Sequence, residues 1–201
     1  MPQPEIALPE LYVQPGESHL VREPTIMRTV LGSCVGITFW APRLCAAGLC
    51  HPMLPVFPAK PTQSSLANSR RYVDFAIRDL SKQFDSLGAR RGEIEVKLFG
   101  GGDVLAVTNP ASRPTVGRLN CEAALRVLDE EGFAVAASSL GGTSGINIQF
   151  NTGTGEVLLK RLSLPKACTP GVNCSIGSAC PSWETCALRA RTRHERHNGQ
   201  R

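Results

Sequence analysis

Two strand-like segments joined by a short turn constrain the fold of this chain more than any other feature. Residues Thr29 to Trp40 and Cys45 to His51 are rich in apolar and β-branched side chains, and Ala41-Pro42-Arg43 between them is a turn signal. The pattern predicts a β-hairpin over these residues. We therefore expect this part of the chain to form two neighbouring strands of a β-sheet.

A cysteine and a histidine lie within this predicted hairpin. Cys34 follows Gly32-Ser33, where the backbone is free to turn sharply or to come close to a substrate, and His51 ends the second segment. Folding of the hairpin is expected to bring the two side chains within reach of each other. A thiol beside an imidazole is the minimum arrangement for nucleophilic thiol chemistry.

An inert role for Cys34 stays open on the residues alone. Free cysteine is among the most buried residue types, and most cysteines in small domains only pack. The chain has eight cysteines, so the type by itself does not single out Cys34. His51 is the only histidine between His19 and His194, which narrows the choice of a base.

Strands and two amphipathic helices make up most of the remaining chain. One helix is predicted to end at Gly88 and to bury one face, and a second is predicted over residues 121–131. Strand patterns cover residues 11–13, 94–99, 133–138, 146–150 and 157–162. The fold class predicted is α/β, a layered sandwich with mixed sheets and two main amphipathic helices. The apolar face of the first helix consists of Val73, Ala76, Ile77, Leu80, Phe84 and Leu87.

Composition and charge restrict the function classes. The hydrophobic fraction of 42% and the charged fraction of 19% are typical of a globular protein. The first residues have neither the basic nor the apolar region of a secretory signal, and no apolar run is long enough to cross a membrane, so a cytoplasmic location without membrane insertion is expected. No basic stripe with interleaved aromatic residues occurs before the C-terminal tail, which argues against nucleic-acid binding.

The C-terminal segment differs in character from the rest. Residues 1–166 are predicted to form one domain, and residues 167–201 a tail that is rich in cysteine and then in arginine and is expected to be disordered. Residues 187–201 carry five arginines and one glutamate, a net charge of +4. Metal binding by the tail is the alternative, although the spacing is wider than zinc sites favour. The four cysteines are Cys168, Cys174, Cys180 and Cys186.

Several separately spaced motifs of this chain resemble those of one known family. The segment from Thr29 to Gly36 resembles that family's "T-x-L-G-S-C-V" signature, and Gly48-Leu-Cys-His-Pro-Met-Leu-Pro55 resembles its second signature. The family is that of the CheD-type chemoreceptor glutamine deamidases. The resemblance extends over residues 9–164. The motifs that follow in order are Tyr72, Gly88-Ala89, Lys97 to Gly102, Val116 to Asn120, Leu140 to Gly142 and Ile148 to Phe150.

This resemblance implies an activity and a set of catalytic residues. It implies an enzyme, a protein-glutamine glutaminase, in which Cys34 attacks receptor glutamine side chains and His51 is its base. Thr29 would orient the histidine, and the alternative for Thr29 is a β-branched residue that only fills a strand. Methyl-accepting chemotaxis receptors would be the substrates and a CheC-type phosphatase a further partner. No cofactor and no metal are implied, and the protein is expected to be a monomer.

A non-catalytic adaptor is the alternative function. Such a protein would bind a receptor or a CheC-type phosphatase and modulate it without any reaction. Intact Cys34 and His51 favour the enzyme, because an adaptor need not keep both residues. A thiol hydrolase that acts on some other protein is a second alternative.

Overall fold

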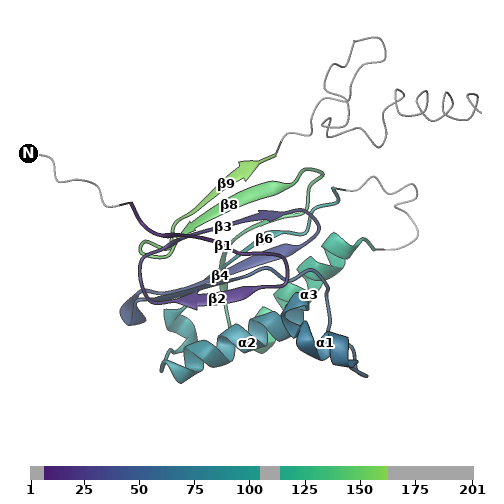
Figure 1. Ribbon diagram of the computed structural model, residues 1–201, viewed down its shortest axis with the longest axis horizontal. Coiled ribbons are helices and arrows are strands. Elements are labelled where there is room, and N and C mark those ends of the chain that lie inside the picture. Colours follow the sequence, from purple (N-terminus) through teal and green to yellow (C-terminus); the bar gives the residue numbers. More distant parts are fainter. Residues whose placement is uncertain (1–6, 105–113, 163–201) are drawn as a thin grey trace, which may run out of the picture. The chain divides into compact units, whose positions relative to one another are not determined.

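The computed structural model describes residues 7–104 and 114–162. Two β-sheets pack face to face, and helices cover the outer face of one of them (Figure 1). One sheet has four strands in the order β1-β3-β8-β9, and the other has five in the order β2-β5-β4-β6-β7. The layered α/β sandwich that the sequence predicts is confirmed.

Both sheets are mixed, because each contains one parallel pair of strands. β1 runs parallel to β3 and β6 runs parallel to β7, while the other pairs are antiparallel. The four-stranded sheet consists of β1 (Glu10–Tyr12), β3 (Ile26–Leu31), β8 (Ile146–Asn151) and β9 (Val157–Arg161). The five-stranded sheet consists of β2 (Ser18–Val21), β4 (Val35–Ala41), β5 (Ala46–Cys50), β6 (Glu95–Gly100) and β7 (Val135–Leu140). The α-helices are α1 (Gln63–Ala67), α2 (Val73–Ser86) and α3 (Val116–Glu130).

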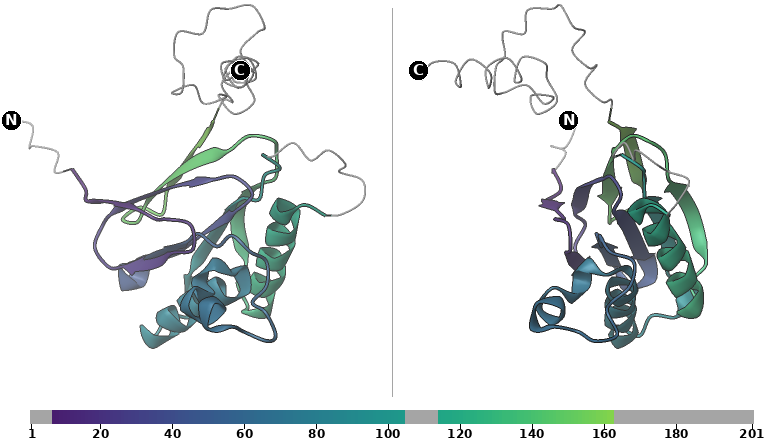
Figure 2. Two further views of the ribbon diagram at one scale, coloured as in Figure 1. Left: turned by 45° about the vertical axis from the view of Figure 1, so that its right-hand side comes forward. Right: turned by 90° about the vertical axis from the view of Figure 1, so that its right-hand side faces the viewer.

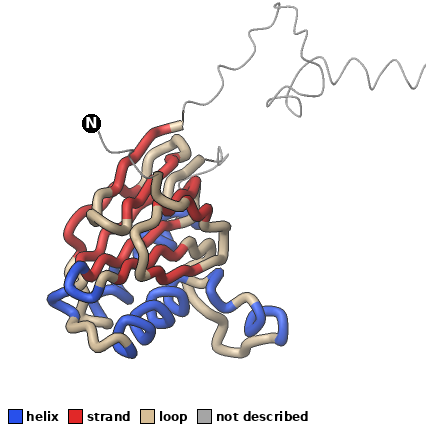
Figure 3. Tube along the Cα trace, turned by 60° about the vertical axis from the view of Figure 1, so that its left-hand side comes forward, coloured by secondary structure: helices blue, strands red, loops and turns tan. Residues whose placement is uncertain are grey.

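Two apolar cores separate the three layers, because residues along the central strands alternate between them. Ile37 and Phe39 of β4 face α2 and α3, whereas Leu49 of β5 and Phe99 of β6 face the four-stranded sheet. Figure 2 and Figure 3 show the helices gathered on one side of the strands. The predicted helix face of α2 is confirmed, since five of its six apolar residues are buried in the helix-side core. The sixth, Leu87, directly follows the helix and is partly buried against the same core.

The predicted strand from Thr29 to Trp40 is wrong as a single element. Residues 26–31 form β3 in the four-stranded sheet, and residues 35–41 form β4 in the five-stranded sheet. Gly32-Ser33-Cys34 is the connection between the two sheets. Glycine and serine leave the chain free to turn there, so one apolar run supplies strands to both layers. The hairpin itself is confirmed for β4 and β5, which pair antiparallel across the short turn at Pro42–Leu44.

The second helix, β2, β7 and α1 also differ from what the sequence predicts, and β7 covers residues 135–140 rather than 133–138. The second helix begins at Val116 rather than at residue 121, because the Thr115 hydroxyl accepts a hydrogen bond from the N–H of Arg118 and caps the helix. β2 and α1 are additional elements. β2 has a burial pattern without clear alternation, and α1 has only five residues, so neither has a strong periodic signal.

Within residues 7–104 and 114–162, no helix is long and apolar enough to cross a membrane. The predicted tail of residues 167–201, with its four cysteines and its arginines, lies outside the described residues.

Candidate active site

Cys34 lies at the point where the chain crosses from one sheet to the other. It follows the last residue of β3 by three positions and immediately precedes β4. The N–H of Val35 donates to the carbonyl of Pro52 at 3.2 Å, which ties the start of β4 to the segment after β5. The Cys34 thiol is half-buried and packs on the apolar cluster between the sheets.

His51 directly follows β5 and is held on both sides of its backbone. Its N–H donates to the carbonyl of Glu17 at 2.9 Å, and its carbonyl accepts from the N–H of Gly16 at 2.7 Å. His51 is only 1% exposed. These bonds continue the pairing of β2 with β5 past the ends of both strands, so the position of the imidazole is set by sheet structure.

The strand register explains how Cys34 and His51 come to the same face. β4 and β5 pair with Ile37 opposite Cys50, and one step further the same register sets Gly36 beside His51. Alternate residues of a strand share a face, so Cys34 and His51 are diagonal neighbours on the face that turns towards the four-stranded sheet. Within the described residues, no hydrogen bond joins the Cys34 thiol to the imidazole.

Thr29 connects this histidine to the other sheet. Thr29 is a β3 residue with no exposed surface, and its Oγ1 lies 2.8 Å from Nδ1 of His51. The same hydroxyl donates to the carbonyl of Val13 at 2.8 Å. The three predicted site residues therefore come from three different segments, and the sandwich brings Thr29 and His51 into direct contact.

This contact determines the tautomer of His51. A threonine hydroxyl has a single proton, and when that proton is donated to Val13 the oxygen can only accept from His51. Nδ1 of His51 then carries the hydrogen, and Nε2 keeps its lone pair. Nε2 is buried and has no hydrogen-bond partner among the described residues. A free, oriented lone pair in a buried site is what a general base requires.

Comparison with known proteins bears on what this arrangement does. Residues 53–161 match the family model described as CheD chemotactic sensory transduction. "Probable chemoreceptor glutamine deamidase CheD 2" of Geobacter sulfurreducens is 44% identical over 80% of this chain and 94% of its own length. The chain belongs to the CheD family.

Other CheD relatives are similar over comparable lengths. "Probable chemoreceptor glutamine deamidase CheD" of Maridesulfovibrio salexigens is 36% identical over 81% of this chain and 97% of its own. The protein of the same name from Pseudomonas syringae pv. tomato is 35% identical over 75% of this chain and 88% of its own. The likeness covers nearly the whole of each relative, so this CheD chain contains the domain that they share.

Burial shifts the pKa values of the thiol and the imidazole in opposite directions. It raises the pKa of the Cys34 thiol above its ordinary value, and the cysteine's own backbone N–H offsets only part of this rise. It lowers the pKa of His51, against smaller raising effects of the Val13 carbonyl and the Glu17 carboxylate. Both shifts favour a neutral thiol beside a neutral imidazole in the free protein.

Two carbonyl groups of the loop that carries Cys34 accept hydrogen bonds from a neighbouring glycine run, and these bonds hold the loop in place. The carbonyl of Gly32 accepts from the N–H of Gly102 at 2.8 Å, and the carbonyl of Cys34 accepts from the N–H of Gly101 at 2.7 Å. The N–H groups of Ser33 and Cys34 make no hydrogen bond to another described residue. The glycine loop (Gly100-Gly101-Gly102) therefore lies directly against the Cys34 loop (Gly32-Ser33-Cys34).

Asn120 is a further site residue, which the sequence motifs contain without marking it as functional. It lies on α3 with no exposed surface, and its Nδ2 donates to the carbonyls of Ser33 and Met53, at 2.9 Å each. The helix predicted over residues 121–131 excludes Asn120, but the observed helix places it one turn before the buried Ala124, as a polar residue on an apolar helix face.

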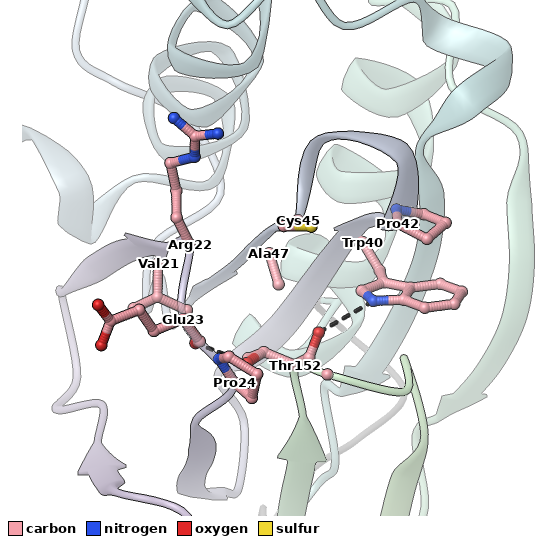
Figure 4. A pocket seen from close by; sticks show the side chains of 10 residues that line it. Val21, Arg22, Glu23, Pro24, Trp40, Pro42, Cys45, Ala47 and Thr152 are labelled. Carbon is pink, nitrogen blue, oxygen red and sulfur yellow. Dashed lines mark hydrogen bonds between the residues drawn. The ribbon is translucent and has the colours of Figure 1, made fainter.

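Two cavities lie away from Cys34. One, of about 230 Å³, is at the turn end of β4 and β5, where the Trp40 indole N–H donates to the carbonyl of Thr152 and Cys45 lies at the rim (Figure 4). The other, of about 400 Å³, is polar and lies between β2 and α2. Neither cavity is lined by Cys34 or His51.

Proposed function

We propose that this protein deamidates glutamine side chains in the cytoplasmic domains of chemoreceptors, with Cys34 as the nucleophile, His51 as the general base and Thr29 as the residue that orients His51. The observation that carries the proposal is the buried contact between Thr29 and His51, which leaves Nε2 with a free lone pair on the face shared with Cys34. Membership in the CheD family and the names of its relatives supply the substrate class.

The first half of the reaction forms a thioester. Nε2 of His51 takes the proton of the Cys34 thiol while the sulfur attacks the side-chain amide carbon of the glutamine. The carbonyl oxygen becomes an oxyanion in a tetrahedral intermediate. The intermediate collapses as the C–N bond breaks, and protonated His51 gives its proton to the departing nitrogen, which leaves as ammonia.

The second half of the reaction is hydrolysis. Neutral His51 takes a proton from water, and the oxygen attacks the thioester carbon through a second oxyanion. The C–S bond then breaks and the proton returns to the sulfur, which leaves a glutamate on the receptor and a free Cys34 thiol. One water is consumed and one ammonia released in each cycle.

Neutral groups in the free site suit this sequence of steps. Since burial raises the pKa of the Cys34 thiol and lowers that of His51, the proton moves only when the glutamine is in place to receive the sulfur. The N–H groups of Ser33 and Cys34, which bond to no other described residue, are the donors proposed for the oxyanion. A hydrogen bond stabilises the oxyanion more than it stabilises the amide.

Mass spectrometry of a receptor cytoplasmic fragment tests the proposed reaction. Conversion of an amide to an acid raises the mass by about 1 Da, and peptide mapping locates each converted glutamine. We expect conversion with the wild-type protein and none with Cys34→Ala. If the wild-type protein binds the fragment without converting any glutamine, the adaptor function is supported in place of the enzyme. A CheC-type partner, a monomeric state and a cytoplasmic location stay predictions.

A further inference from the structure

We infer that Asn120 is a positioning residue that fixes the peptide groups of the Cys34 loop (Gly32-Ser33-Cys34) so that backbone N–H groups face the oxyanion. The inference rests on the proposed function and extends it to a residue outside the Cys34, His51 and Thr29 set. It starts from the two hydrogen bonds that the Asn120 amide makes to the segments carrying the thiol and the imidazole.

The orientation of the Asn120 amide follows from its partners. The carbonyl oxygens of Ser33 and Met53 are acceptors only, so the NH₂ group of the amide must face them. Ser33 is next to Cys34, and Met53 lies two residues after His51. One buried side chain therefore bridges the loop that carries the nucleophile and the segment that follows the base.

The bond to Ser33 determines where the neighbouring N–H group points. The described part of the chain contains no cis peptide, and in a trans peptide the C=O and N–H bonds point in opposite directions. The carbonyl of Ser33 is directed at Asn120, so the N–H of Cys34 is directed away from α3. The carbonyl of Gly32 is likewise directed at Gly102, so the N–H of Ser33 is directed away from Gly102.

Close contact between α3 and the glycine loop brings the Asn120 side chain within hydrogen-bonding distance of the carbonyls of Ser33 and Met53. Gly117 lies three residues before Asn120, on the same side of the helix. A Cβ on Gly117 would come within 2.6 Å of the carbonyl oxygen of Gly101, and a Cβ on Gly101 would come within 2.9 Å of the carbonyl oxygen of Gly117. Glycine at both positions lets the two backbones touch.

Only the NH₂ half of the Asn120 amide is paired with other described residues. Oδ1 is buried and has no hydrogen-bond partner among the described residues. A buried acceptor without a partner is unfavourable for folding, and an apolar side chain would remove that cost only by leaving the carbonyls of Ser33 and Met53 without their donor. The benefit of asparagine here is the pair of bonds from Nδ2.

The experiment compares two reactions of Cys34 in full-length Asn120→Ala. Deamidation passes through an oxyanion, whereas alkylation by iodoacetamide displaces iodide at a saturated carbon and forms none. We expect kcat for the receptor fragment to fall by about 10- to 100-fold with KM nearly unchanged, and the alkylation rate at pH 7.5 to stay within about threefold of wild type. Arg126→Ala, on the exposed face of the same helix, is the control and should retain both rates.

A second variant separates the inference from a folding defect. Asn120→Asp keeps the shape of the side chain, but the ionised form has no donor for the two carbonyls, while the protonated form has one. Burial raises the pKa of such a carboxyl, so kcat of Asn120→Asp relative to wild type should rise as the pH is lowered from 8 to 6.

Two outcomes would overturn the inference while leaving the proposed function intact. One is an Asn120→Ala protein with wild-type kcat. The other is a parallel loss of deamidation and alkylation in Asn120→Ala, together with a pH-independent ratio for Asn120→Asp, which would indicate general collapse of the site. Absence of deamidation by the wild-type protein would instead refute the proposed function itself.

Discussion

At the scale of single residues, the hydroxyl of Thr29 makes two hydrogen bonds that a mutation can remove without changing the shape of the side chain. It accepts from Nδ1 of His51 and donates to the carbonyl of Val13. Thr29→Val keeps the shape and removes both bonds, so we expect the deamidation rate to fall by about tenfold or more because the imidazole loses its orientation. Thr29→Ser keeps the hydroxyl and should retain most of the activity. Equal rates for the valine and serine variants would mean that Thr29 only fills the strand.

Cys34 and Cys50 lie close to each other in the fold, and we expect only Cys34 to be reactive. Cys50 precedes His51 and is completely buried, and burial raises the pKa of its thiol, so it stays protonated and unreactive. We expect Cys50→Ala to lower the free energy of unfolding by about 1 kcal/mol with activity largely retained, and Cys34→Ala to abolish activity with little effect on unfolding. Chemical denaturation and the deamidation assay measure the two effects. If Cys50→Ala is as inactive as Cys34→Ala, the assignment of a single nucleophile fails.

The pH dependence of activity follows from the shift at His51. The base must be neutral, and burial lowers its pKa below the ordinary 6.5. The kcat/KM value should therefore stay level as the pH falls from 8 to 6.5 and should decline only below that. A decline with a midpoint above pH 7 would show that an imidazolium is stabilised in the free protein.

The lowered pKa of His51 also makes the folded protein less stable at acid pH than at neutral pH. The unfolded chain takes up the His51 proton near pH 6.5, before the folded chain does, so the contribution of neutral His51 is full above that pH and is lost as the pH falls towards the folded pKa. His51→Asn should be less sensitive than wild type to acid unfolding in this window. Denaturation midpoints at pH 5 and pH 7.5 provide the comparison.

At the scale of elements, α3 packs closely on the glycine loop, which in turn bonds to the loop that carries Cys34. Replacing a helical glycine by alanine ordinarily stabilises a helix, but a Cβ on Gly117 would lie 2.6 Å from a backbone oxygen that cannot move aside easily. We expect Gly117→Ala to lower the free energy of unfolding by about 1–3 kcal/mol and to lower activity further. Gly92→Ala is the matched control, because a Cβ added to Gly92 would meet nothing within 4 Å. Denaturation curves that coincide for the two variants would contradict a tight contact.

Local patterns predict the elements better than the contacts between them. The apolar face of α2, the β4–β5 hairpin and the Gly-rich connection between β8 and β9 follow from periodicity and turn residues. The split of residues 29–40 between two sheets does not, because both strands are apolar and only Gly32-Ser33 marks the change. The contact of Thr29 with His51 depends on that split, and the register of two strands in different layers is a tertiary property.

At the scale of the whole molecule, we propose that residues 1–166 form the CheD domain and residues 167–201 a separate tail. The two apolar cores are built from residues between 13 and 150, so the domain should not need the tail to fold. Truncation after Lys166 should leave a folded, active protein. Loss of folding in the truncated protein would show that the tail belongs to the domain.

We predict that the tail affects the rate at which the protein binds its substrate more than the rate of the reaction steps at Cys34. It carries a net charge of +4 in residues 187–201, so its removal should weaken attraction to acidic receptor helices or anionic lipid, chiefly at low salt. Deamidation rates of full-length and truncated protein at two ionic strengths test this. Zinc content measured in parallel tests the alternative: one zinc per full-length chain and none per truncated chain would identify a metal site in the cysteine segment.

Trapping of the acyl intermediate tests the central claim, that catalysis proceeds through a thioester at Cys34. Hydroxylamine attacks thioesters faster than water does, so its addition should divert part of the reaction from glutamate to the hydroxamate, which is about 16 Da heavier than glutamine, at the same receptor positions. We expect both products with the wild-type protein and neither with Cys34→Ala or His51→Ala. Formation of glutamate or hydroxamate by Cys34→Ala at the wild-type rate would contradict the central claim.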